Sequence, residues 1–433
     1  MDHNVQTNVH TNVKTVTVQL PQGQITGTRL AQVSRFSSVP YAQPAVGPLR
    51  FAPPVPARWT GTLDATQPMP VCPQLASRLR GVMGDFQAQQ SEDCLRLTVW
   101  TPSADTRKRP VVIWLHGGAW QSGGGAVDWY DGARLAARGD IVVVGVNYRL
   151  AALGWLYVPG ETANVGLLDE EAAIRWVVEH IAHFGGDPEQ ITLMGHSAGA
   201  FNIAAMLTRQ PQFQRAILHS ASLGRGFREA KQAAYLSGVF LKAAGAEDLA
   251  QARSLPLEAL FAAQQSPAVA QALKEEGANR SLFCPVVDGE IFPSPVEPLM
   301  QTACAAVDVL VGSTLNEMAA FPGMSINEQS QQLGEQIFRA PGRQWATNAR
   351  TSGRQAWSFS FDYAPNLEVG ACHCIDLPFV FGNLDAFAHA PMLKGMVAEH
   401  AALLVDQLQT AWIEFVHGRS PGWEMAPAVK VFK

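Results

Sequence analysis

Residues 190–205 read QITLMGHSAGAFNIAA and combine a strand, a tight turn and the start of a helix. The apolar run at 191–194 is typical of a buried strand, and the Ala-, Met- and Leu-rich segment at 198–207 favours a helix. Between them, residues 195–199 follow the pattern G-x-S-x-G. In such a nucleophile elbow the serine sits on a strained turn, and the flanking glycines are needed because side chains there would collide with neighbouring elements. The pattern therefore predicts that Ser197 is exposed at the tip of a strand.

Ser197 also precedes a predicted helix, whose free N–H groups and positive dipole end favour developing negative charge. An alternative is that Ser197 only caps this helix in a Gly-rich loop. A helix cap needs no catalytic partners, whereas a nucleophile does. Whether the chain also offers a base and an acid therefore decides between the two roles for Ser197.

The composition is that of a globular protein with a large core: 433 residues, 47% apolar and 16% charged. The net charge is −5 and no Lys/Arg cluster occurs, so we expect no nucleic-acid partner. No apolar run reaches the length of a membrane span, and the polar start MDHNVQTNVHTNVK lacks the features of a secretory signal. We therefore expect a cytoplasmic protein with no membrane partner. The sequence leaves the oligomeric state open.

Six cysteines stand at positions 72, 94, 284, 304, 372 and 374, which is average usage and not a disulfide scaffold. Cys372-His373-Cys374 has no second Cys or His pair at the spacing of a zinc finger. We therefore expect neither a metal site nor a cofactor.

The pattern along the chain predicts one α/β domain over residues 1–433. Residues 14–36 alternate apolar and polar residues around a Pro/Gly turn, which indicates an antiparallel meander, and the six prolines of residues 40–56 indicate an irregular segment. Buried strands are expected at 95–100, 110–115, 141–146, 215–219, 308–312 and 356–361, and helices at 167–184 and 394–416. This order favours a mostly parallel sheet flanked by helices, with Ser197 at the carboxyl end of a strand. The largely helical segment at 229–303 is expected to form a cap.

The predicted strand at 110–115 runs directly into His116-Gly117-Gly118-Ala119-Trp120. A loop of such small residues exposes backbone N–H groups, as an oxyanion hole requires. A flexible Gly-rich linker is the alternative, but linkers rarely follow so apolar a strand.

A serine nucleophile needs a base to take its proton and a third group to orient that base. His373 follows a late strand, and hydrolases with a nucleophile elbow carry Ser, acid and His in that order along the chain. Glu317 lies in the matching position for the acid, with Asp288 and Asp308 as alternatives. His219 is the second candidate for the base.

Together these motifs resemble the type-B carboxylesterases, a branch of the α/β-hydrolases that includes cholinesterases and bacterial para-nitrobenzyl esterases. The resemblance runs from about residue 16 to residue 423. Its main signatures are SEDCL at 91–95, HGGAW at 116–120, NYR at 147–149, the elbow at 195–199 and GACHCIDLPFVFG at 370–382.

The resemblance implies an α/β-hydrolase fold and a role for each matching residue. The implied triad is Ser197, Glu317 and His373, and the implied oxyanion donors are the N–H groups of Gly118, Ala119 and Ala198. It also implies that Ser222 supports the acid and base, and that Arg149–Asp169 and Arg50–Glu92 are buried ion pairs. Cys72 and Cys94 match an Ω-loop disulfide pair, which a reducing cytoplasm would leave as thiols.

Three departures from the family pattern bear on the pocket. His196 and Ala200 replace the usual Glu and Gly of the elbow, and the loop from Cys72 to Cys94 contains no Trp. A choline ester is therefore not expected, since no aromatic platform for quaternary ammonium is present in this loop. Only 56 residues separate Glu317 from His373, fewer than usual in the family. We therefore expect a shortened helical cap region at 318–355 and a pocket that is more open or has a differently built wall.

The resemblance implies a serine carboxylesterase that works through an acyl-enzyme. The reduced cap, without a recognisable lipid-binding lid, favours short-chain, soluble esters. The alternative from another class is a catalytically inactive interaction protein on the same fold. Within the enzymes, a polyester hydrolase, a thioesterase and an amidase remain open.

Overall fold

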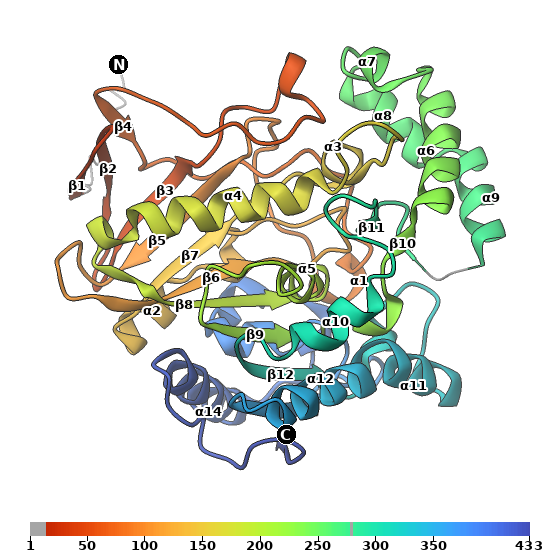
Figure 1. Ribbon diagram of the computed structural model, residues 1–433. Helices are drawn as coiled ribbons and strands as arrows, with labels where there is room; N and C mark the ends of the chain where they lie inside the picture. The colour runs from red at the N-terminus through yellow and green to blue at the C-terminus, as the bar shows by residue number, and fades with distance from the viewer. Residues whose placement is uncertain (1–13, 278–279) are drawn as a thin grey trace, which may run out of the picture.

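The computed structural model describes residues 14–277 and 280–433. Residues 1–13, on which most of the expectation about a secretory signal rests, lie outside this part. A twelve-stranded mixed sheet in the order β1-β2-β3-β5-β7-β6-β8-β9-β12-β13-β14, with β4 beside β2, crosses the molecule (Figure 1). Its strands are β1 (Thr15–Leu20), β2 (Gly23–Arg29), β3 (Ser34–Pro40), β4 (Thr62–Asp64), β5 (Arg96–Thr101), β6 (Arg109–Leu115), β7 (Val142–Val146), β8 (Gly186–His196), β9 (Arg215–His219), β12 (Asp308–Thr314), β13 (Ala356–Phe361) and β14 (Val429–Phe432).

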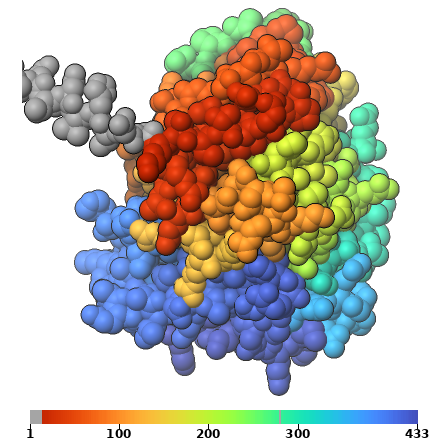
Figure 2. Space-filling view, turned by 90° about the vertical axis from the view of Figure 1, so that its left-hand side faces the viewer, coloured from red at the N-terminus to blue at the C-terminus, as the bar shows by residue number. Residues whose placement is uncertain are grey.

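The sheet is antiparallel at its N-terminal edge and parallel beyond it. β1, β2 and β3 pair antiparallel, which confirms the predicted meander, and β5 is antiparallel to both of its neighbours. From β7 to β14 each neighbouring pair is parallel. Figure 2 shows the N-terminal residues in red lying together, with the C-terminal residues in blue in the lower part of the same view.

The helices cover both faces of the sheet. They are α1 (Arg80–Met83), α2 (Ala133–Gly139), α3 (Ala151–Trp155), α4 (Val165–His180), α5 (Ala198–Met206), α6 (Ala230–Ala244), α7 (Leu249–Ala252), α8 (Leu257–Gln264), α9 (Pro267–Glu276), α10 (Glu297–Ala303), α11 (Glu328–Gly334), α12 (Ala340–Thr351), α13 (Leu377–Phe381) and α14 (Ala398–Val416). Within the described residues, no helix has both the length and the apolar character needed to cross a membrane.

Alternate residues of each central strand enter two different cores, because successive side chains of a strand point to opposite faces. In β6, Val111, Ile113 and Leu115 belong to the core that also contains residues of α4, α5 and α12, whereas Val112 and Trp114 belong to the core that contains residues of α2, α13 and α14. The continuous apolar run read from the sequence is therefore a strand buried on both faces, and the α/β-hydrolase fold expected from the resemblance is confirmed.

Helices α6 to α9 stand together at the upper right of Figure 1, where α6 packs against α8 and α9. The segment at 318–355, expected as the shortened cap, contains α11 and α12. The structure places α12 as the crossover between the parallel strands β12 and β13, packed on both.

Strand β14 was not anticipated, because its four residues follow a Pro/Gly-rich segment and are too few to show a pattern.

Both ion pairs implied by the resemblance are present. Arg149 binds Asp169 with an Nη2–Oδ1 distance of 2.6 Å, and Arg50 binds Glu92 at 2.7 Å. The Arg149–Asp169 side chains are almost fully buried, and the backbone N–H of Arg149 also donates to Asp169. Removing one partner would leave the other charge buried without compensation.

We predict that Asp169→Asn lowers the free energy of unfolding by about 3–5 kcal/mol, since it leaves Arg149 as an uncompensated buried charge. Urea denaturation followed by circular dichroism measures this as a lower midpoint. The control is Asp385→Asn, which breaks the exposed pair with Arg134 and should cost about 0–1 kcal/mol. Equal losses of stability from the two substitutions would show that the buried ion pair contributes no more to stability than the exposed one.

All six cysteines are buried and free. The thiols of Cys72 and Cys94 are neighbours: the hydrogen bond with Cys72, together with burial, raises the pKa of Cys94 well above its usual value. The Cys72 sulfur also accepts a hydrogen bond from the backbone N–H of Leu150 at 3.2 Å. The pair thus occurs here as thiols.

Candidate active site

Ser197 occupies the turn between β8 and α5 with φ 53° and ψ −113°. A positive φ is strained for a residue other than glycine, and a hydrogen bond from the Ser197 N–H to the carbonyl of His219 at 2.8 Å holds it. A Cβ at Gly199 would lie 2.2 Å from the Leu115 oxygen, and one at Gly195 would lie 2.8 Å from the Ala200 nitrogen. These close approaches are the reason for glycine at both positions.

We predict that Gly199→Ala strongly destabilises the protein, because the added methyl group meets a backbone carbonyl that cannot rotate away. Overpacking of this kind costs roughly 1–3 kcal/mol or more, measured as a lower melting temperature with loss of activity. The matched control is Gly238→Ala in α6, where nothing lies within 4 Å of the new methyl group. An unchanged melting temperature for Gly199→Ala would contradict the close approach.

The loop after β6 leaves backbone donors free beside Ser197. Gly118 and Ala119 have φ of 120° and 55°, and the turn closes through the Gly118 carbonyl, which accepts from Gln121 and Ser122 at 3.0 and 3.2 Å. Among the described residues, no hydrogen bond uses the N–H of Gly118 or of Ala119. Ala198 is the first residue of α5, so its N–H has no acceptor within the helix. A Cβ at Gly117 would lie 3.2 Å from Ser197 Cβ, so this loop packs directly against the elbow.

Glu317 and His373 form a buried hydrogen-bonded pair. Nδ1 of His373 bonds Oε2 of Glu317, and both side chains are about 1% exposed or less. The other oxygen, Oε1, accepts from Ser220 Oγ at 2.7 Å and from the Thr314 N–H at 2.9 Å. These donors fix the carboxylate, which in turn orients the imidazole and leaves Nε2 as its free nitrogen.

The loops that carry this pair are joined to each other. Glu317 follows β12 and His373 follows its neighbour β13. The Asn316 N–H donates to the Ala371 carbonyl at 2.8 Å, and the Ala371 N–H donates to Asn316 Oδ1 at 2.9 Å. Residues 56 positions apart in the chain are thereby held in register at one end of the sheet.

The serine that contacts the Glu317 carboxylate is Ser220 and not Ser222. Ser220 directly follows β9, and its N–H donates to the Gly312 carbonyl at 2.7 Å, which places its hydroxyl against Glu317. Ser222 is buried two residues later, at the start of a short 3-10 turn, and no hydrogen bond among the described residues joins it to Glu317 or His373. The motif match indicated the right loop and the wrong hydroxyl, because sequence spacing does not show which side chain turns inward.

The alternative acids and base occupy other positions. Asp308 begins β12, at the opposite end of the strand from Glu317, and accepts from the Gln355 N–H. Asp288 accepts from two backbone N–H groups of its own turn. His219 has both ring nitrogens occupied, since Nδ1 bonds Asp376 at 2.6 Å and Nε2 accepts from the Trp412 indole at 2.9 Å.

Two buried networks that support the site have no sequence signature. One is the Trp412–His219–Asp376 chain, which ties the loop of His373 to β9 and α14. The other joins Trp120 Nε1 to Asn202 Oδ1 at 2.8 Å and Asn202 Nδ2 to Glu170 Oε1 at 2.9 Å, and thereby anchors the loop after β6. Burial raises the pKa of Glu170 well above its usual value, which favours the neutral acid.

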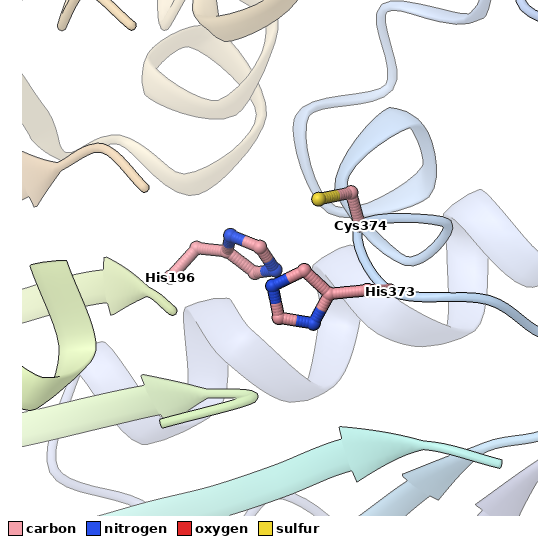
Figure 3. Close-up of side chains that lie close together, drawn as sticks. All are labelled: His196, His373 and Cys374. Atoms are coloured by element: carbon pink, nitrogen blue, oxygen red, sulfur yellow. The ribbon is translucent and has the colours of Figure 1, made fainter. Parts of the chain in front are cut away.

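His196, at the position of the usual Glu, lies beside His373 with ring centroids 4.5 Å apart. Figure 3 shows the two imidazoles turned toward each other, with the Cys374 thiol next to them. One potential ligand atom from each residue lies within 4.8 Å of the others. Burial, followed by the nearby His373 and His219, lowers the pKa of His196 well below its usual value, so its imidazole is neutral. The expectation of no metal site considered only residues 372–374, and the fold brings His196 beside two of them, His373 and Cys374. An ion here would compete for the imidazole of His373, so this cluster belongs to the same site.

A cavity of about 330 Å³ contains Ser197, His373, Gly118 and Ala119 among its lining residues. Other hollows of about 420 and 720 Å³ lie elsewhere on the molecule and contain none of these residues. Ser197 and His373 share the cavity, although no hydrogen bond joins the Ser197 hydroxyl to an imidazole among the described residues. Such contacts often tighten only when substrate is bound.

Comparison with known proteins agrees with this arrangement. The model of the carboxylesterase family matches residues 14–332. The para-nitrobenzyl esterase of Bacillus subtilis is 32% identical, over 93% of this chain and 90% of its own length. A probable N-octanoylanthranilate hydrolase of Rhodococcus erythropolis is 36% identical, over 94% of this chain and 95% of its own length.

Solved structures show the same similarity. A thermophilic PNB esterase superimposes with a TM-score of 0.84 at 31% identity, over 94% of this chain and 92% of its own. The carboxylesterase Est55 of Geobacillus stearothermophilus superimposes with a TM-score of 0.79 at 29% identity, over 96% of this chain and 93% of its own. With matches of this extent in both sequence and structure, the chain belongs to the carboxylesterase family and is a carboxylic ester hydrolase.

Proposed function

We propose that this chain is a serine esterase for short-chain, soluble esters, with Ser197 as nucleophile, His373 as base and Glu317 as the acid that orients it. One observation carries the proposal: the buried Glu317–His373 pair leaves a single imidazole nitrogen free, and His373 lines the cavity that also holds Ser197. A serine, an oriented base and unpaired backbone donors in one cavity are what acyl transfer needs.

In the proposed reaction, Ser197 Oγ attacks the ester carbonyl while His373 Nε2 takes the hydroxyl proton. The N–H groups of Gly118, Ala119 and Ala198 stabilise the oxyanion of the tetrahedral intermediate. The imidazolium then gives its proton to the departing alkoxide, which leaves the acyl group on Ser197. Water, deprotonated by His373, attacks this acyl-enzyme, and collapse of the second intermediate returns the proton to Ser197 and releases the acid.

Aromatic packing around the base supports this role. The rings of Phe321 and Phe338 lie 5.4 and 5.1 Å from that of His373, centroid to centroid. An apolar cover of this kind keeps water from the Glu317–His373 hydrogen bond, where electrostatic interactions are stronger than in solvent.

The test is labelling with a fluorophosphonate probe, together with turnover of para-nitrophenyl esters from acetate to palmitate. Wild type should be labelled and Ser197→Ala should not, whereas an inactive interaction protein would take no label. Para-nitrobenzyl acetate belongs in the panel because the Bacillus relative carries that alcohol in its name.

We predict higher activity on dissolved tributyrin than on an olive-oil emulsion, because a cavity of about 330 Å³ accommodates a short acyl ester and not a long-chain glyceride. Titration of released acid at constant pH measures both substrates with one method. Faster release from the emulsion would contradict the short-chain preference.

A further inference from the structure

The cavity that contains Ser197 carries positive charge, and none of its described lining residues is a carboxylate. Among these residues, Arg78 and Arg280 alone have a permanent charge, and the rest are apolar or neutral apart from His373. Arg225 stands beside them: the guanidinium of Arg280 donates to the Arg225 carbonyl at 2.6 Å and to the Phe227 carbonyl at 2.8 Å. The side chain of Arg280 is thus held against the backbone at 225–227, at the wall of the pocket.

Of these three arginines, Arg78 is exposed and Arg225 and Arg280 are half-buried, and they lack the carboxylate partners that buried arginines such as Arg149 have. Arg149, Arg228 and Arg50 each bind a carboxylate at 2.6–2.8 Å. None of Arg78, Arg225 and Arg280 forms an ion pair with a residue in the described part of the chain. Glu276, the carboxylate at the end of α9, is taken by Arg228 through two hydrogen bonds.

The positive charges of the three arginines act on one another. Burial, and then the nearby guanidiniums of Arg78 and Arg280, lower the pKa of Arg225 to about 10. Like charges that are brought together and partly removed from water repel each other, and a bound anion would relieve this repulsion. A guanidinium also presents paired donors that match a carboxylate.

We propose that Arg78, Arg225 and Arg280 form an anion site in the ester pocket, and that the preferred substrates are esters that carry a carboxylate or a similar monoanion. This inference rests on the proposed esterase function and specifies its substrate class. Arg78, Arg280 and Ser197 line the same cavity of about 330 Å³, a volume in the range of small-molecule sites. One small ester can therefore present its anion to the arginines and its carbonyl to Ser197.

The loop from Cys72 to Cys94, which contains no Trp, contributes Arg78 to this wall. A pocket for a quaternary ammonium needs an aromatic face at such a position, whereas a guanidinium repels a cation and attracts an anion. The loop therefore argues against choline esters, because it contains no Trp, and for anionic esters, because it contributes Arg78.

Two matched substrate pairs test the inference and locate the anion. On the acyl side, 4-nitrophenyl hemiadipate is compared with 4-nitrophenyl hexanoate, and on the alcohol side 4-acetoxybenzoate is compared with its methyl ester. The rates measured with Ser197→Ala are subtracted as background. We expect kcat/KM to favour the anionic ester in at least one pair, with the preference falling as ionic strength rises. The pair that shows the preference identifies the side that carries the anion.

The variants Arg78→Gln and Arg280→Gln should each reduce that preference about tenfold to a hundredfold, the range for a hydrogen bond to a charged group. The preference is the ratio of kcat/KM for the anionic ester to kcat/KM for its neutral partner, so a general effect of the substitution on the pocket cancels. Arg350→Gln removes one exposed charge that does not line the cavity and should change neither substrate.

Equal kcat/KM for the anionic and neutral esters in both pairs would overturn the inference, as would a preference that both arginine variants retain. Either result leaves hydrolysis of the neutral esters intact. Failure of the proposed function would differ, since neutral esters would then not be hydrolysed, or Ser197→Ala would hydrolyse them as fast as wild type.

Discussion

Ser197→Ala and His373→Ala are each expected to lower kcat for para-nitrophenyl acetate by about 10⁴- to 10⁶-fold, because the nucleophile and its base act as a unit. The residual activity should stay about 10³- to 10⁴-fold above the reaction in water, from the oxyanion donors and substrate binding. Steady-state kinetics measures the loss, and circular dichroism checks that the variants fold.

The matched control is Ser222→Ala, a buried serine in the loop after β9, which makes no hydrogen bond to Glu317 or His373 in the described structure. Its kcat should remain within about threefold of wild type. Near-wild-type turnover by His373→Ala would refute the assignment of the base. His219 could not replace it without first losing its contacts to Asp376 and Trp412.

Glu317→Gln is expected to lower kcat by about 10³- to 10⁴-fold while KM for a small ester stays within about threefold. The carboxylate accepts from three donors: His373 Nδ1, the Ser220 hydroxyl and the Thr314 N–H. An amide has only one oxygen. In one orientation of the amide its NH₂ group faces the Thr314 N–H, and in the other it faces the His373 nitrogen. One existing hydrogen bond is lost in each case, so the imidazole loses its orientation or its tautomer. Glu317 does not line the cavity, and substrate binding should therefore persist.

Ser220→Ala removes one of the three donors and should lower kcat only about twofold to tenfold, the value of an ordinary hydrogen bond. Asp288→Asn should have no effect, since that carboxylate binds only the N–H groups of its own turn. A large loss for Asp288→Asn together with none for Glu317→Gln would identify Asp288 as the acid.

Much of the fold could be predicted because its signals are local. The apolar runs that form β6, β7 and β9, the alternation in β1 to β3 and the G-x-S-x-G turn each depend on interactions within a few residues. Boundaries were less accurate: α14 was expected from residue 394 and begins at Ala398, after a short 3-10 turn at Pro391–Leu393. Helix ends depend on capping and packing more than on apolar spacing.

By itself the sequence determined the α/β order of elements, the strained turn at Ser197 and the small-residue loop beside it, because glycine spacing and strand patterns are properties of adjacent residues. Only the tertiary structure decided that Ser220 and not Ser222 contacts Glu317, that His196 meets His373 and Cys374, and that Arg78 and Arg280 line one pocket with Arg225 beside them. These contacts join residues that are far apart in the chain or fix which way a side chain turns. Both depend on how the sheet brings its loops together, which no local pattern records.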